Sequence, residues 1–202
     1  MKVFLLNIFM VFFYRKEEKM NYSKTKQLTM ASMFLTLGLI LPFITMQIPT
    51  LGSQLLPMHI PVMICGFVLG PFYGTLIGLI TPILRSIVFG MPPLFPTGIC
   101  MAFELAAYGF LTGYLYRHMK QTTFNIYVIL ILSMISGRIV WAVINMMIYG
   151  LQGTSFTLSM FIVGALTNAL PGIIIQLIFI PIIVVALKKG NWIYERTMDE
   201  LF

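Results

Sequence analysis

The sequence predicts an all-α integral membrane protein with six transmembrane helices and with both the N and C termini in the cytoplasm. Of its 202 residues, 59% are hydrophobic and only 9% are charged, and its mean hydropathy is +0.94. A soluble domain has about a quarter of its residues charged, so this chain has too little polar surface to cover itself in water. The placement of its basic residues around the apolar segments gives the orientation.

Six apolar segments follow one another along the chain. Each is long enough to approach or complete a membrane span at a rise of about 1.5 Å per residue. The second segment is short and contains two prolines, and the sixth is long and also contains two. The segments are 26–44, 55–69, 71–90, 97–116, 125–149 and 158–187.

The basic residues lie on one side of these segments. The short connections 45–54, 91–96 and 150–157 carry no charge at all. Because Lys and Arg are enriched in cytoplasmic flanks, the neutral connections are predicted to face outside and the termini to face the cytoplasm. The basic residues that flank the first, fourth and sixth segments are Lys24, Lys26, Arg117, Lys120, Lys188 and Lys189.

The first nineteen residues form a separate extension. Their apolar part, Val3 to Tyr14, is too short to cross a bilayer of roughly 30 Å, and RKEEK follows it instead of a small-residue cleavage site. Either translation begins at Met20, or residues 1–19 lie on the membrane surface. The expected organisation is therefore the extension 1–19, a six-helix transmembrane domain over 20–190, and a cytoplasmic tail over 191–202.

Several classes of function are disfavoured by the motifs that the sequence lacks. It has no GxxxxGK[ST] for ATP hydrolysis and no HExxH, GxSxG or intramembrane acidic pair for a protease or lipid hydrolase. Cys65 and Cys100 lie in apolar runs without CxxC spacing, which indicates neither a disulfide nor a metal site. No Lys/Arg stripe alternates with aromatic residues, so no nucleic acid is expected as a partner. We expect no enzymatic activity and no cofactor.

Three charged residues inside the spans require an explanation. A charge at the centre of a membrane helix costs at least ~2.5 kcal/mol, so such residues face a cavity or a partner. Arg85, Glu104 and Arg138 give two guanidinium groups and one carboxylate. If Glu104 pairs with one arginine, the other is left for an anionic ligand, because guanidinium binds carboxylate with two parallel hydrogen bonds. The sequence leaves open which arginine takes which role.

Other polar and aromatic residues fall in the same, outer half of the predicted spans. Arg138, Trp141 and Asn145 are spaced i, i+3 and i+7 and share one helix face, and Glu104 and Tyr108 are spaced i and i+4. The candidate ligand-binding residues are Arg85, Glu104, Arg138, Trp141, Asn145, Asn168, Tyr108 and His59.

The chain also resembles a known family. Residues 60–90, IPVMICGFVLGPFYGTLIGLITPILRSIVFG, are similar to the substrate-binding S components of energy-coupling factor (ECF) transporters, most specifically in GFVLGPFYG at 66–74. The similarity covers about residues 24–190. It implies a multi-pass protein of the bacterial cell membrane that captures a vitamin or related micronutrient. It further implies docking on a shared module of one membrane coupling protein and two ATPases.

One feature departs from the family pattern. The family's first helix presents small residues four apart to the coupling protein. Here Ala31 is followed by Leu35, and the nearest small pair is Ser32 with Thr36. Whether the first helix docks on the coupling protein is therefore left open.

Two functional hypotheses follow. The first is a capture subunit for a small water-soluble vitamin or precursor, for which pantothenate is one candidate. Its pocket is expected beneath connections 45–54, 91–96 and 150–157, with 45–54 as a lid. The second is a small membrane enzyme or assembly factor in which the Arg/Glu network is catalytic or purely structural.

Overall fold

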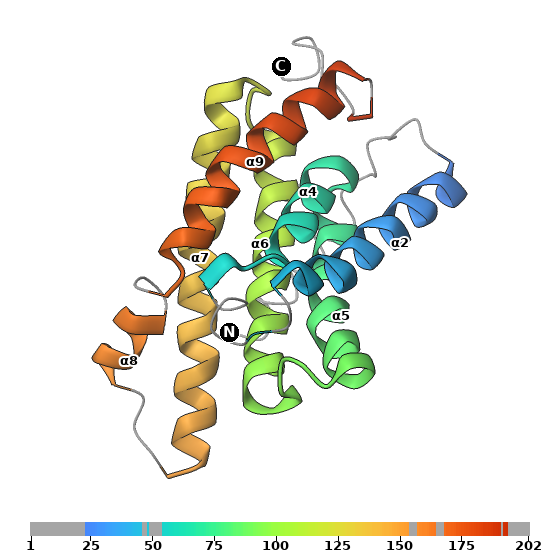
Figure 1. Ribbon diagram of the computed structural model, residues 1–202. Helices are drawn as coiled ribbons and strands as arrows, with labels where there is room; N and C mark the ends of the chain where they lie inside the picture. Colours follow the sequence, from blue (N-terminus) through green and yellow to red (C-terminus); the bar gives the residue numbers. More distant parts are fainter. Residues whose placement is uncertain are drawn as a thin grey trace, which may run out of the picture.

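The computed structural model is helical throughout the residues that it describes (Figure 1). The predicted extension 1–19, most of the predicted lid 45–54 and most of the tail 191–202 lie outside these residues. The described residues are 23–45, 48, 54–153, 157–164, 168–190 and 192–193.

The helical elements of the described residues are seven α-helices, one short 3-10 helix (η1) and one short π-helix (η2). Five stretches are long and apolar enough to cross a membrane: 24–45, 71–89, 94–118, 123–151 and 170–189. The elements are α2 (Lys24–Ile40), η1 (Leu41–Thr45), α4 (His59–Leu69), α5 (Pro71–Phe89), η2 (Leu94–Gly98), α6 (Ile99–His118), α7 (Thr123–Leu151), α8 (Leu158–Ile162) and α9 (Leu170–Lys189).

The prediction of an all-helical membrane chain is confirmed for the described residues, but the count of six spans is not. The second apolar segment forms α4, whose 11 residues extend about 16 Å, roughly half of a bilayer core. The sixth apolar segment contains two separate helices, α8 and α9, with residues 168–169 in a turn directly before α9. Only α9 has the length of a span.

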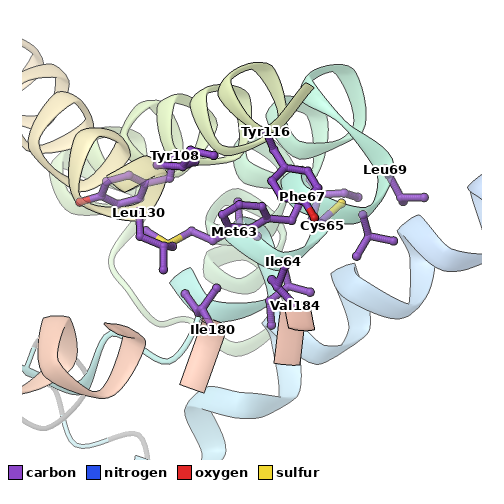
Figure 2. Close-up of a cluster of buried hydrophobic side chains, with 14 of the residues drawn as sticks. Met63, Ile64, Cys65, Phe67, Leu69, Tyr108, Tyr116, Leu130, Ile180 and Val184 are labelled. Atoms are coloured by element: carbon purple, nitrogen blue, oxygen red, sulfur yellow. The ribbon is translucent and has the colours of Figure 1, made fainter. Parts of the chain in front are cut away.

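Helix α4 is short and is enclosed by protein. Every residue from Pro61 to Leu69 is buried, and α4 packs against α2, α5, α6 and α9. A helix that is apolar on all sides is typical of such an enclosed position. Side chains of α4 meet those of α6, α7 and α9 in one apolar cluster, which includes Met63, Tyr108, Leu130 and Ile180 (Figure 2).

Helix α6 lies at the centre of the bundle and packs on α4, α5 and α7 (Figure 1). Small residues bring these helices together, as their four-residue spacing predicts. A Cβ on Gly74 of α5 would lie 2.7 Å from the carbonyl carbon of Gly109 on α6, and one on Gly78 would lie 2.5 Å from that of Leu105. The backbones of α5 and α6 are thus in direct contact.

The turn between α4 and α5 depends on Gly70 and Pro71. Gly70 has φ +90, a conformation that residues with a side chain rarely adopt, and Pro71 occupies the first turn of α5. The guanidinium of Arg117 fills the space beside Gly70, and its Nη2 donates to the carbonyl of Leu69 at 3.0 Å. The end of α6 is thereby fixed to the end of α4.

The outward faces of the long helices are apolar. Large exposed side chains lie along α5, α7 and α9, as expected for helices that face lipid. They include Leu76, Ile80, Ile83 and Ile87 of α5, Ile131, Ile135 and Ile139 of α7, and Ile174, Ile178 and Ile182 of α9.

Contacts gather the three basic flanks at one end of the bundle. The Nζ of Lys188 donates to the carbonyl of Gln121 at 2.9 Å, which joins the end of α9 to the connection between α6 and α7. The Nζ of Lys26 lies 5.3 Å from the centre of the Trp192 ring, which joins the start of α2 to the segment after α9. The ends of α6 and α9 lie together at the top of Figure 1.

Candidate functional site

A carboxylate buried among three other polar side chains forms the centre of the candidate site. Glu104 of α6 is 2% exposed, and its Oε1 accepts hydrogen bonds from the Nη1 of Arg138 and from the Tyr108 hydroxyl, each at 2.9 Å. The Nε2 of His59 lies 3.7 Å from the same oxygen. We call these four residues the Glu104 centre.

Three helices bring the Glu104 centre together. Glu104 and Tyr108 are one turn apart on α6, His59 is the first residue of α4, and Arg138 lies near the middle of α7. A side chain at Gly137 would collide with the Tyr108 ring, so this glycine allows α7 to approach α6 beside Arg138. The rings of His59 and Tyr108 lie 5.3 Å apart.

Several polar atoms of the Glu104 centre have no hydrogen-bond partner among the described residues. They are both ring nitrogens of His59 and the Nε and Nη2 of Arg138, all of them buried. Burial of a polar group without a partner costs about 1–3 kcal/mol, and more for a charged group. Buried polar atoms without a partner beside one carboxylate therefore mark a position where a polar ligand would be stabilised.

Two residues on α7 that share a helix face with Arg138 make other contacts. The amide of Asn145 donates to the backbone carbonyl of Trp141 at 2.8 Å, within its own helix. The indole of Trp141 lies against Gly164, where a Cβ would be 2.7 Å from the ring. Arg138, Trp141 and Asn145 all lie on the continuous helix α7, and Asn145 has no hydrogen bond to Glu104 among the described contacts.

Asn168 lies farther along the chain, between α8 and α9. It is half-buried, and its backbone N–H donates to the carbonyl of Val163 at 2.9 Å. No hydrogen bond or ion pair of its side chain with the Glu104 centre is found among the described residues. Its predicted role in binding stays a prediction.

Arg85 lies apart from the Glu104 centre and has different partners. Its side chain is 2% exposed, and its Nη1 donates to the carbonyl of Leu39 at the end of α2. Its guanidinium carbon lies 5.1 Å from the ring centre of Phe43 and 5.4 Å from that of Phe89. A carbonyl and two aromatic rings stabilise a buried guanidinium. Arg85 thus joins α5 to η1, and its predicted contact with ligand remains untested.

A further buried polar residue was not among the sequence candidates. Gln176 of α9 is 1% exposed, and its Nε2 contacts the carbonyl of Leu56 at 3.5 Å. The same carbonyl accepts from the backbone N–H of His59 at 3.1 Å, and Leu56 has φ 50, in the left-handed region. Gln176 therefore helps to hold the turn that positions His59. Its signal in the sequence is an amide inside a strongly apolar segment.

No curated protein and no solved structure matches the chain. The family model described as the substrate-specific component of the ECF transporter matches residues 26–184. The match runs from within the first turn of α2 into α9 and includes all four residues of the Glu104 centre. This chain therefore belongs to the family of ECF transporter substrate-specific components.

Proposed function

We propose that this protein is the substrate-capture subunit of an ECF-type importer and binds a small water-soluble vitamin or precursor from outside. It delivers this cargo inward by docking on a shared module of a membrane coupling protein and two ATPases. The family supports the general role, since its members are transporter subunits and not enzymes. The observation that carries the proposal for the site is the set of buried polar atoms of His59 and Arg138 beside Glu104 that have no hydrogen-bond partner among the described residues.

The ligand class follows from these donors. Arginine and histidine N–H groups in an apolar interior favour a ligand with anionic or strongly polar acceptors. Pantothenate has such groups, as do other carboxylate-bearing precursors of cofactors. Trp141, Asn145 and Asn168 are proposed to contact the part of the ligand farther from Glu104.

Reversible binding tests this role against the alternative of a membrane enzyme or a purely structural network. Purified protein in detergent or nanodiscs is expected to bind one member of a panel of water-soluble vitamins and their precursors and to release it chemically unchanged. Isothermal titration measures the affinity, and mass spectrometry of the released compound measures turnover. A chemically altered product would favour the enzyme, and no binding by any member would contradict the capture role.

We propose further that the chain crosses the bacterial cell membrane six times with both termini cytoplasmic. The contacts that gather Lys26, Lys188 and Gln121 at one end of the bundle support this orientation, because basic flanks face the cytoplasm. A sixth crossing requires the residues before His59 to complete the part of the bilayer that the 11 residues of α4 do not span.

Cysteine labelling in intact cells tests the orientation. A cysteine at position 155, in the neutral connection after α7, is expected to react with a membrane-impermeant reagent. A cysteine in place of Thr122, the residue that caps the start of α7, is expected to react only after the cells are opened. The opposite pattern would overturn the orientation and the outward-facing site with it.

A further inference from the structure

We propose that the two edges of the Arg138 guanidinium have separate tasks: one holds Glu104, and the other binds a carboxylate of the ligand. This inference rests on the proposed capture function and specifies the chemical group that the site recognises. It also assigns Glu104 as a positioning residue that acts through Arg138.

The planar geometry of guanidinium supports the division. The Nε–H and one N–H of Nη2 point the same way, as two parallel donors, while Nη1 lies on another edge. The structure uses Nη1 for Glu104 at 2.9 Å. Both Nε and Nη2 are buried and have no hydrogen-bond partner among the described residues. The unpartnered atoms are therefore the complete two-pronged edge.

The orientation of this edge is fixed before a ligand arrives. The Glu104 carboxylate is 2% exposed and is itself held by the Tyr108 hydroxyl at 2.9 Å. Gly137, next to Arg138, allows the Tyr108 ring to pack closely against α7. A donor pair that is already held in place loses little conformational entropy on binding, which favours high affinity.

The charges at the site favour a carboxylate over a phosphate. The guanidinium of Arg138 already faces one negative charge at Glu104. A carboxylate adds one more and presents two coplanar acceptors that match the fork. A phosphate would bring up to two negative charges to a single guanidinium inside an apolar interior, where uncompensated charge is costly.

Arg85 has different surroundings from Arg138. Its Nη1 donates to the Leu39 carbonyl, and the Phe43 and Phe89 rings lie over its guanidinium. Among the buried polar atoms without a partner in the described part of the chain, two belong to Arg138 and none to Arg85. The structure therefore distinguishes the two arginines by the full burial of this edge in Arg138 and by the Glu104 carboxylate beside it.

Matched pairs of probes test the assignment on the wild-type protein. Each pair consists of a carboxylate and its uncharged counterpart: pantothenate and panthenol, nicotinate and nicotinamide, biotin and biotinamide. For the pair that binds, the carboxylate is expected to bind about tenfold to a hundredfold more tightly than its uncharged counterpart. This difference corresponds to the free energy of charge-assisted hydrogen bonds. Equal affinity within that pair would overturn the assignment and leave the capture function intact. No binding by any probe would contradict both.

The variant Arg138→Lys then tests whether the preference for the carboxylate comes from Arg138. Lysine keeps the positive charge beside Glu104 but lacks the two-pronged edge. The preference for the carboxylate over its uncharged partner is expected to fall to within about threefold. The same change at Arg85 is the comparison. If Arg85→Lys removes the preference and Arg138→Lys keeps it, the assignment to Arg138 is wrong. If Arg138→Lys fails to fold, the probe pairs on the wild type still decide the ligand class.

Discussion

Substitution of Gly74 by valine is expected to prevent stable folding of the bundle. Gly74 lies where α5 and α6 pack, and among the described elements this pair has the most extensive contact. A Cβ there would lie 2.7 Å from the carbonyl carbon of Gly109 and 2.9 Å from the Cα of Gly66. These are backbone atoms, so no side-chain rotation relieves the collision. Forced separation of the helices is expected to cost about 3 kcal/mol, at the upper end for overpacked cores.

Gly150 provides the matched control. It lies near the end of α7, and a Cβ built there would have no atom within 4 Å. Gly150→Val is expected to change the free energy of unfolding by no more than about 0.5 kcal/mol. Size-exclusion profiles and thermal unfolding in detergent compare the two variants. A Gly74→Val protein as stable as Gly150→Val would mean that α5 and α6 do not pack backbone to backbone.

Much of this fold is predictable from sequence because membrane burial imposes simple rules. Every apolar stretch in lipid must satisfy its backbone internally, so composition and length identify the helices. The four-residue spacing of Gly74 and Gly78 on α5 also indicates close helix packing. The span count is harder, because the length of α4 depends on what encloses it. An 11-residue helix is acceptable once neighbouring helices cover it, and no local pattern encodes that enclosure.

The residues of the candidate site could be predicted from the sequence, but most of the contacts between them could not. The pairing of Glu104 with Tyr108 follows from their i, i+4 spacing on one helix. The choice between Arg85 and Arg138 does not, because it depends on how α5 and α7 are rotated about their axes. The structure turns Arg138 toward Glu104 and places Arg85 against Leu39. Gln176 was missed because its partner is the carbonyl of Leu56, 120 residues earlier.

Substitution of Arg138 by methionine is expected to lower the free energy of unfolding by about 3–5 kcal/mol. Methionine fills a similar volume but leaves the Glu104 carboxylate buried without its counter-ion, which is the costly way to break a buried pair. Glu104→Gln in the same chain removes the stranded charge and keeps an oxygen that accepts from the Tyr108 hydroxyl. The double variant is therefore expected to recover all but about 1–2 kcal/mol of the loss, because a buried ion pair contributes little net stability.

Ligand binding by this double variant separates a functional network from a structural one. If the Glu104 centre served only to hold the helices together, a recovered fold would bind ligand as the wild type does. If Arg138 contacts the ligand, the recovered fold lacks the fork at Nε and Nη2 that the wild type leaves without a partner. We expect the double variant to unfold near the wild-type temperature yet to bind the carboxylate ligand at least about tenfold more weakly. Thermal unfolding and titration on the same preparation measure both quantities, and wild-type affinity in a stable double variant would show that Arg138 and Glu104 have a structural role only.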